Sequence, residues 1–424
     1  MAISRAAGEA AVPAGANGFP HDIVADQQHT AVEQRERSKE NRPLGRRCLG
    51  QQARVKASDD GPRRAVVVGA SLAGLMAAIA LARAGWQVTV LERAGAHRAS
   101  GAALAVNPSD LVRLLGRDAS ATVLSHLAHD AADGSAGLPV TWRALHTGLQ
   151  SVAAQHPRIR LHHRSPVVKV GQDAGQVWAT TDSGAVCTGD VLVGADGYRS
   201  VVRAAVAPDN PDARFAGYVL WLGIAAEQNP GPGRWPTGLD IQDSGDHLLL
   251  GYPLPAPNGV RTPGSRRLGW AWYDASRNGA FRRAGSVRGD VVQRSLRPAD
   301  ISETTYAELA AQARRLWPAP WAEAIVDSVA RRDVTATPIS EYLPDQLVAG
   351  RLVLVGDAAH VPSPMTGAGF GAALADAETL ARAMAAANSA TAPDALLTYE
   401  RKRLGPARSL VESGQRFSRS FAGR

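Results

Sequence analysis

The segment Gly-Ala-Ser-Leu-Ala-Gly that begins at Gly69 has the residue types and spacing of a turn that holds phosphate groups. In such turns Gly69 would allow the tight bend, and Gly74 would allow a helix to pack closely on a strand. A helix that begins at Leu72 and Ala73 would direct its free N–H groups and the positive end of its dipole toward a pyrophosphate. Ser71 takes the place of the usual middle glycine, and its small side chain still permits close approach of a ligand.

A carboxylate extends this pattern. Glu92 lies eighteen residues after Gly74, close to the position where an acidic residue hydrogen-bonds the ribose of a dinucleotide, and Arg93 follows it. The negative charge would repel a 2′-phosphate, so the pattern favours FAD or NAD over NADP at this site. A tight turn in an unrelated α/β protein is the alternative interpretation. The combination of a strand, a helix, a second strand and an acid favours the cofactor.

The elements that must position these residues form a βαβ unit. Residues 65–68 are apolar and β-branched, as in a strand buried on both faces, and residues 87–92 are predicted to form a second strand. Residues 72–84 between them are typical of an Ala/Leu-rich helix. Later segments are predicted as strands at 167–193, antiparallel strands at 218–272, helices at 305–331, a buried strand at 351–355, a helix at 371–387, and a closing helix at 393–424 that is broken near Gly405 and Pro406.

The basic charge of the chain does not indicate a nucleic-acid partner. The formal charge of +8 comes from the two ends, because residues 1–63 carry ten basic and eight acidic residues and residues 401–424 carry seven and one. Residues 64–400 are therefore neutral and show no basic patch with interleaved aromatics. The basic residues of the last segment, Arg401, Lys402, Arg403 and Arg408, are expected to face solvent.

Composition excludes several other classes. The cysteines Cys48 and Cys187 cannot form a disulfide framework, and no Cys/His cluster suggests a metal site. No apolar run reaches the ~20 residues of a membrane span, and the first residues do not form a secretory signal. We therefore expect a cytoplasmic protein, and the Ala/Arg-rich composition suggests a bacterial source. Residues 1–63 contain one aromatic residue and are predicted to be a disordered extension.

Two further segments complete a set of three signatures. Residues 193–203 read Val-Gly-Ala-Asp-Gly-Tyr-Arg-Ser-Val-Val-Arg, and residues 356–371 read Gly-Asp-Ala-Ala-His-Val-Pro-Ser-Pro-Met-Thr-Gly-Ala-Gly-Phe-Gly. In order and spacing, the turn at Gly69 and these segments resemble the signatures of the class A flavoprotein monooxygenases, the family of para-hydroxybenzoate hydroxylase. The segments 217–221, 251–255 and 267–273 are most similar to its 2,6-dihydroxypyridine 3-monooxygenase branch.

The resemblance implies an α/β fold with α+β elements, in which a Rossmann-like FAD-binding domain is interleaved with an antiparallel-sheet substrate domain. The domains would be a disordered extension at 1–63, the FAD-binding domain at 64–208 with a return segment at 335–392, the substrate domain at 209–334, and a C-terminal helical tail at 393–424.

The resemblance also implies cofactor contacts for residues of all three parts of the FAD-binding domain. Arg143 matches the family's arginine near the FAD phosphates and ribityl chain. Asp196 and Gly197 match a motif used for both FAD and the nicotinamide cofactor. Asp357, which follows Gly356, matches the aspartate that hydrogen-bonds a ribityl hydroxyl.

The loop after residue 360 would reach the flavin ring itself. Pro364 would lie beside the isoalloxazine, and the backbone of Gly367, Gly369 and Phe370 would face its N1/O2 edge. The start of the following helix would stabilise negative charge at that edge, as helix N-termini do. His360 is a candidate for relaying a proton, with a fixed structural role as the alternative.

The activity implied by the resemblance is hydroxylation of a phenolic or hydroxy-N-heteroaromatic ring. In the family, NADH or NADPH reduces FAD, O₂ adds at flavin C4a, and the hydroperoxide delivers one oxygen to the ring. The expected partners are a small aromatic substrate, O₂ and the nicotinamide cofactor, without nucleic acid or a membrane span, and the expected assembly is a homodimer. Candidate ring-facing residues are Trp221, Tyr252, Trp270 and Trp272, for which packing in the core is the alternative.

Two other functions remain open at this point. One is a flavin-dependent epoxidase or other oxidase of a non-aromatic substrate, because the cofactor signatures do not distinguish it. The other is an FAD-binding protein without turnover. The segment between Gly116 and Trp142 is shorter than is usual in the family, and this keeps the second alternative open.

Overall fold

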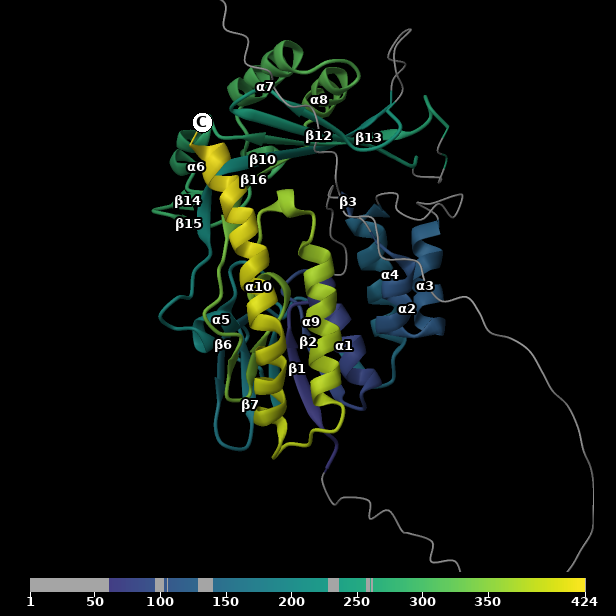
Figure 1. Ribbon diagram of the computed structural model, residues 1–424, viewed down its shortest axis with the longest axis vertical. Coiled ribbons are helices and arrows are strands. Elements are labelled where there is room, and N and C mark those ends of the chain that lie inside the picture. Colours follow the sequence, from purple (N-terminus) through teal and green to yellow (C-terminus); the bar gives the residue numbers. More distant parts are fainter. Residues whose placement is uncertain are drawn as a thin grey trace, which may run out of the picture. The chain divides into compact units, whose positions relative to one another are not determined.

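The computed structural model describes residues 61–95, 103–104, 106–128, 140–227, 236–256, 260 and 262–423. Residues 1–60 of the predicted extension and residues 129–139 of the short segment lie outside this range. The fold class predicted from the sequence is confirmed: a parallel sheet with helices, an antiparallel sheet and a C-terminal helix are all present (Figure 1).

Apolar β-branched runs form the parallel sheet. In the described chain its strands are β1 Arg64–Val68, β2 Gln87–Leu91, β5 Ile159–His162, β9 Val191–Gly194, β17 Val348–Ala349 and β18 Leu352–Leu354. Their order in space is β17–β18–β9–β1–β2–β5, and only the β17–β18 pair is antiparallel. The carboxyl ends of β1, β9 and β18 therefore meet at one edge of the sheet, which brings the three sequence signatures together.

Helices cover one side of this sheet and a small sheet covers the other (Figure 1). The helices are α1 Leu72–Arg83, α2 Pro108–Leu115, α3 Arg117–Ala128, α4 Trp142–Gln155 and α9 Gly369–Met384. The opposite side carries α5 Val201–Val206 and the meander β6 Val167–Gln172, β7 Val177–Thr181 and β8 Val186–Gly189. The short strands β3 Ala103–Leu104 and β4 Val140–Thr141 pair with each other.

The predicted antiparallel strands form a second sheet. Within the described residues they are β10 Arg214–Ala226, β11 Asp240–Asp243, β12 His247–Leu254, β13 Arg267–Asp274, β14 Val287–Arg288, β15 Val291–Val292 and β16 Val334–Glu341. The order is β11–β12–β13–β10–β15–β14, and β16 also pairs with β10. The predicted return to the nucleotide-binding part at residue 335 thus comes near the start of β16, whereas the chain rejoins the parallel sheet only after this strand.

One face of the antiparallel sheet packs on helices. These are α6 Asn278–Arg283, α7 Glu303–Leu316 and α8 Trp321–Ala330, and they bury a core that includes Trp221, Trp270 and Trp272. The helical region predicted at 305–331 is therefore two helices. The break falls at residues 317–320, where Pro318 and Pro320 cannot donate the hydrogen bonds of a continuous helix.

The closing helix α10 is continuous from Ala392 to Ala422, so the predicted break near Gly405 and Pro406 is wrong. Both residues are exposed, and the carbonyl group that loses its N–H partner to proline can be hydrated there. The helix packs on α9 and extends to β10 (Figure 1).

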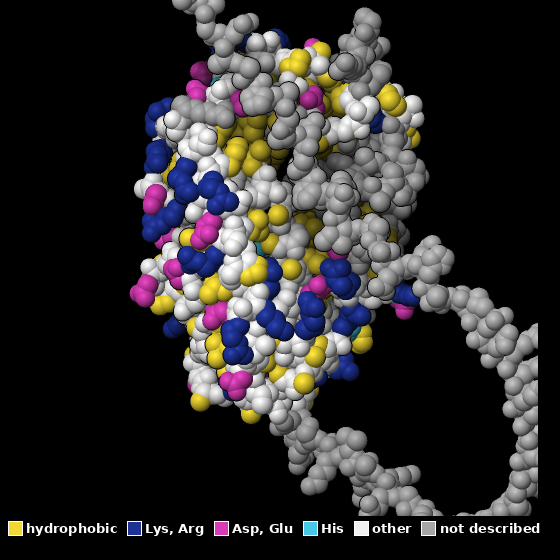
Figure 2. Space-filling model, viewed as in Figure 1, with side chains coloured by type: hydrophobic (Ala, Val, Ile, Leu, Met, Phe, Trp, Pro, Cys, Tyr) yellow, Lys and Arg dark blue, Asp and Glu magenta, His cyan; other side chains and the backbone are white. Residues whose placement is uncertain are grey.

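The expectation that Arg403 faces solvent is also wrong. Its Nε lies 2.7 Å from the buried Asp376 carboxylate of α9, a long-range contact that helical periodicity cannot reveal. Arg401 and Lys402 are exposed as expected, and Lys and Arg side chains are frequent on the face of the molecule shown in Figure 2. No helix within the described ranges is long and apolar enough to cross a membrane.

Candidate functional site

Both glycines of the first signature are required by backbone contacts. Gly69 has a φ of +101°, and its N–H donates to the Leu91 carbonyl at 2.8 Å. A Cβ atom at Gly69 would lie 2.3 Å from the Ala195 carbonyl oxygen, and one at Gly74 would lie 1.9 Å from the Gly69 oxygen. Only glycine fits either position, because α1 and the ends of β1 and β9 approach each other this closely.

The first turn of α1 is open to a ligand. Ser71 is the N-cap residue, but its side chain does not cap the helix, although Leu75 N–H bonds to the Ser71 carbonyl. Helix N-termini without a side-chain cap leave donors for an anion. Glu92 accepts hydrogen bonds from the backbone N–H groups of Ala70 at 2.7 Å and Ala94 at 2.8 Å. The predicted ribose ligand therefore also holds the turn, a role that the sequence pattern did not indicate.

A cavity of 240 Å³ joins the first and second signatures. It is lined by Val68, Gly69, Ser71, Leu91, Glu92, Arg93, Pro166, Val167, Ala195, Asp196, Gly197, Tyr198, Arg199 and Val201. Six of these are predicted cofactor residues, so the structure brings residues from distant segments of the chain to one hollow. Arg93, Asp196 and Gly197 also line an adjoining cavity of 560 Å³ that extends to residues 293–300.

Asp196 has a structural partner that the resemblance did not imply. Its carboxylate accepts hydrogen bonds from the Ser200 hydroxyl at 2.5 Å and the Val201 N–H at 2.7 Å, and so it caps α5. Burial raises the pKa of Asp196, and these hydrogen bonds oppose the rise. Contacts of Asp196 with FAD or a nicotinamide cofactor stay a prediction, and the cap fixes where its carboxylate lies.

Asp357 presents a carboxylate to the edge of the parallel sheet. It lies in the short helix η2 Gly356–Ala358, directly after β18. Its side chain is exposed and accepts no hydrogen bond from any described residue. The surrounding protein nevertheless raises the pKa of Asp357 by desolvation, and His360 and Arg203 oppose this rise. An accessible carboxylate enclosed by protein is suited to accept hydrogen bonds from a bound ligand.

Arg203 binds the backbone of the turn that carries Asp357, a role that the sequence analysis did not predict. It is 1% exposed, and its guanidinium donates to the carbonyl groups of Asp357 at 3.3 Å, Ala358 at 3.2 Å and Tyr198. The same group lies 4.2 Å from the centre of the Tyr342 ring. Arg203 thus links the second signature to the third. Its position at the end of the second signature was the available signal.

His360 is enclosed beneath the same turn. It is 1% exposed, and its Nε2 lies 2.8 Å from Asp376. Asp376 also accepts hydrogen bonds from Arg403 Nε at 2.7 Å and from the Gly356 N–H at 2.9 Å. Burial would lower the pKa of His360, but Asp376 raises it overall. This geometry favours the fixed structural role over the proton relay for His360.

The loop of the third signature leads into an uncapped helix. Pro364 is exposed in η3 Pro364–Thr366, and Gly367 adopts a φ of +61° with no atom within 4 Å of an added Cβ. The N-terminus of α9, at Gly369 and Phe370, has no side-chain cap. A cavity of 630 Å³ lies against it and is lined by Val106, Asn107, Pro108, Asp110, Gly367, Ala368, Phe370, Gly371, Ala372, Ala375, Arg403, Pro406 and Leu410.

Arg143 lies apart from these contacts. It is the second residue of α4, is exposed, and forms no hydrogen bond or ion pair with the described residues. The predicted contact of Arg143 with the FAD phosphates therefore rests on the resemblance alone.

The prediction that Trp221 and Trp270 face the substrate is wrong, and the same holds for Trp272. All three lie on the sheet face that packs on the helices, and Trp270 is 1% exposed with its indole N–H 3.0 Å from the Ser328 hydroxyl of α8. The alternative, core packing, is the observed one. Tyr252 lies on the opposite face, because it pairs with Gly269 and its ring covers that glycine.

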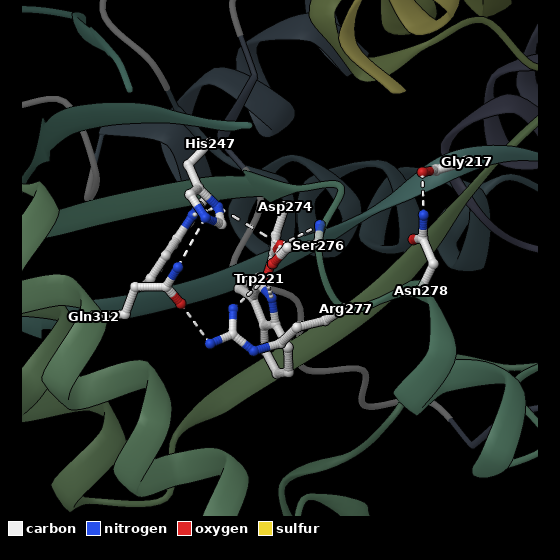
Figure 3. Close-up of polar contacts among 9 residues, drawn as sticks. Gly217, Trp221, His247, Asp274, Ser276, Arg277, Asn278 and Gln312 are labelled. Atoms are coloured by element: carbon white, nitrogen blue, oxygen red, sulfur yellow. Dashed lines mark hydrogen bonds and ion pairs between the residues drawn. The ribbon is translucent and has the colours of Figure 1, made fainter. Parts of the chain in front are cut away.

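A buried polar network explains how Trp221 is held (Figure 3). Its indole N–H donates to Asp274 at 3.2 Å, and Asp274 also accepts hydrogen bonds from Arg277 at 2.5 Å and from the Ser276 hydroxyl at 2.6 Å. Burial would raise the pKa of Asp274, but Arg277 and the Ser276 hydroxyl lower it overall. His247 lies 3.6 Å from the same carboxylate. The network joins the sheet to α7 and lies on the face away from Tyr252.

Substitutions at Trp270 and Tyr252 are expected to separate folding from substrate binding. Trp270→Phe removes a buried hydrogen bond and part of a ring, so the free energy of unfolding falls by about 1–3 kcal/mol while KM for an aromatic substrate stays unchanged. Tyr252→Leu is expected to change KM more than stability. Urea unfolding and steady-state kinetics of both variants check this. If KM changes in Trp270→Phe and not in Tyr252→Leu, Trp270 faces the substrate after all.

Comparisons with known proteins agree with this geometry. Residues 63–116 and 268–413 match the model of a family described as FAD binding domain. The chain is similar to class A flavin hydroxylases, and its matched residues resemble an FAD binding domain. It is 28% identical over 336 residues to 2,6-dihydroxypyridine 3-monooxygenase of Paenarthrobacter nicotinovorans, covering 75% of this chain and 82% of that protein.

Two further comparisons cover more of the chain. The 3-hydroxybenzoate 6-hydroxylase of Klebsiella oxytoca is 26% identical, over 84% of this chain and 88% of that one. The solved structure of 2,6-dihydroxypyridine-3-hydroxylase from Arthrobacter nicotinovorans superposes with a TM-score of 0.69 at 25% identity, covering 86% of this chain and 94% of that chain. The predicted cofactor, FAD, is confirmed by the family match.

The residues present fit FAD. The close glycine contacts leave no room for a side chain between α1 and β9, and the uncapped first turns of α1 and α9 provide donors at both ends of the site. The short helix η2, which carries the accessible carboxylate of Asp357, contacts both α1 and α9. Donors suit the anionic and carbonyl groups of the cofactor, and a carboxylate suits its hydroxyl groups.

Proposed function

We propose that this protein is an FAD-dependent monooxygenase that uses NADH or NADPH to hydroxylate a phenolic or hydroxy-N-heteroaromatic ring. The convergence of the three signatures at one edge of the parallel sheet, with Asp357 accessible among them, is the observation that carries the proposal. The relatives named above act on dihydroxypyridine and hydroxybenzoate rings, which supports a ring substrate here.

In the proposed reaction, the residues of this chain bind FAD and orient the substrate. When bound, FAD supplies the redox chemistry, taking electrons from the nicotinamide and activating O₂. The α1 N-terminus would hold the pyrophosphate, Glu92 the ribose and Asp357 the ribityl chain. The first turn of α9 would stabilise negative charge on the flavin edge. The apolar sheet face that carries Tyr252 would orient the substrate and exclude water.

The remaining parts of the proposal concern context. We include in it the domain bounds given above, a cytoplasmic location and a homodimeric assembly. The two cysteines, which cannot form a disulfide framework, are consistent with a reducing compartment. Size-exclusion chromatography with light scattering tests the assembly.

Oxidation of the nicotinamide cofactor tests the function. The purified holoprotein is mixed with NADH or NADPH and a panel of phenols, hydroxypyridines and alkenes, and product mass is measured. Oxidation that rises with a ring substrate, together with a product that gains one oxygen, is the expected result. An oxygenated alkene product would indicate an epoxidase. A yellow protein that oxidises no cofactor with any compound would indicate an FAD-binding protein without turnover.

Asp357→Ala is expected to weaken FAD binding by roughly 10- to 100-fold, because a hydrogen bond to a charged group contributes about 1.5–3 kcal/mol. Since the Asp357 carboxylate accepts no hydrogen bond from described residues, its loss should leave the fold intact. Titration of the apoprotein with FAD, followed by fluorescence quenching, measures the effect. Asp209→Ala, at an exposed loop position, is the control. Equal affinity in both variants would contradict the assignment of Asp357.

A further inference from the structure

The two faces of the antiparallel sheet are both apolar, although the helices α6, α7 and α8 cover only one of them. A sheet with one solvated face normally alternates apolar and polar side chains along each strand. Here Leu220 and Leu222 of β10 and Leu248 and Leu250 of β12 all lie on the face away from those helices. The second face therefore needs an apolar cover of its own.

One end of this second face is closed by the chain itself. Tyr218 and Tyr273 are buried there against Phe417 and Phe421 of α10. Met365 of η3 packs on the same cluster, so the face continues directly into the loop that follows Asp357. The closed end thus lies next to the proposed cofactor site.

No described residue covers the other end of this face. Leu222, Ile224 and Leu250 are only partly buried, and Ile241 of β11 is 55% exposed. Ile241 lies directly opposite Leu250 in the β11–β12 pair, and Leu222 lies opposite Ala271 in the β10–β13 pair. Residues paired in this way share a face. In Figure 2 hydrophobic side chains gather in a hollow beside this sheet.

On the part of this face formed by β11, β12 and β13, the described charged side chains are at the margins. Arg267 pairs with Leu254 at one end of β13, and its guanidinium donates to the Pro255 carbonyl at 2.7 Å. Asp243 lies on the edge strand opposite Leu248. A carboxylate substituent placed at the centre of the face would be desolvated without a paired cation, which is costly, whereas an alkyl or fused-ring substituent would gain by burial.

We propose that the substrate is a lipophilic aromatic compound whose apolar substituent lies on the open face formed by Leu222, Ile224, Ile241 and Leu250. The inference rests on the proposed function, because it places the substrate ring between this face and the flavin. It goes further in naming an uncharged ring with an alkyl or fused-ring extension over a small carboxylated phenol. The sheet face selects the substituent, and the flavin loop receives the ring.

A homologous series of 4-alkylphenols tests this proposal by binding alone. Equilibrium dialysis of the FAD-loaded protein is expected to show a Kd that falls about three- to fourfold for each added methylene, from methyl to pentyl. The carboxylated phenol 3-hydroxybenzoate is expected to bind more weakly than 4-pentylphenol by roughly 100-fold. A Kd independent of chain length, or tighter binding of the carboxylate, would overturn the proposal.

Two matched variants locate the binding surface. Leu250→Ser is expected to reduce the gain in affinity for each added methylene of the alkylphenol. Leu397→Ser, at an exposed apolar position of α10, is expected to leave this gain unchanged. An equal effect of both variants would also overturn the proposal. Product analysis separates the two levels of inference. If affinity depends on chain length but no product gains oxygen, only the monooxygenase proposal is contradicted. If products gain oxygen but Kd does not depend on chain length, only the proposal of a lipophilic substrate is contradicted.

Discussion

Gly69→Ala is expected to yield a protein without bound FAD. The added Cβ would meet the Ala195 carbonyl oxygen at 2.3 Å, and alanine disfavours the φ of +101° found at this position. Relief of the clash requires β1 and β9 to separate or the turn to α1 to rebuild. Either change moves the helix N-terminus away from the pyrophosphate position.

The cost to the fold is expected to be smaller than the cost to the cofactor. Backbone strain of this kind costs about 1–3 kcal/mol, which a domain of this size can tolerate. Flavin absorbance per protein after purification, together with a circular dichroism melt, separates the two effects. Gly238→Ala is the matched control, since no atom lies within 4 Å of an added Cβ there. If Gly69→Ala retains stoichiometric flavin, the turn at Gly69 is not part of the FAD site.

The part of the site that could be predicted from the sequence is the part built from local motifs. The turns at Gly69, Asp196 and Asp357 each follow a buried strand, and parallel strands align their carboxyl ends, so local patterns were enough to bring these residues together. The roles of Arg203 and Asp376 could not be found in this way. Their partners are backbone groups and side chains from remote segments, and no periodicity encodes them.

The aromatic residues show a different limit. Period-2 spacing correctly placed Trp270 and Trp272 on one face, but spacing does not say which face meets the cofactor. Because both faces of this sheet are apolar, hydrophobicity does not show which face meets the cofactor either. The choice depends on where α8 and α10 pack, which is set by contacts between distant parts of the chain.

Asp376→Ala is expected to destabilise the protein by about 3–5 kcal/mol, the usual cost of leaving a buried charge without its partner. Three donors lose their acceptor: Arg403 Nε, His360 Nε2 and the Gly356 N–H. The last of these belongs to the turn that presents Asp357, so FAD affinity should fall as well. The melting temperature is expected to drop on the order of 10 °C, whereas Asp209→Ala at the protein surface should melt as the wild type does.

The pH dependence of this loss has a definite sign. Burial would raise the pKa of Asp376, but His360 and Arg403 hold it below 3.8, so its contribution is present above that value and disappears as pH falls through the lower folded pKa. Asp376 raises the pKa of His360 above 6.5, so the contribution of His360 is present below 6.5 and disappears as pH rises through the higher folded pKa. The difference in stability between wild type and Asp376→Ala is therefore expected to be largest between about pH 4 and 6.5.

A second variant distinguishes this explanation from a simple cavity. Arg403→Met combined with Asp376→Leu removes the two opposite charges together and fills the space with apolar atoms, so it is expected to recover part of the stability lost in Asp376→Ala. Urea unfolding of the wild type and the two variants at pH 5.5 and 8.5 measures both effects. If the double variant is no more stable than Asp376→Ala, or if the loss does not change with pH, the charge network does not hold the turn. The stability would then come from packing between α9 and α10 alone.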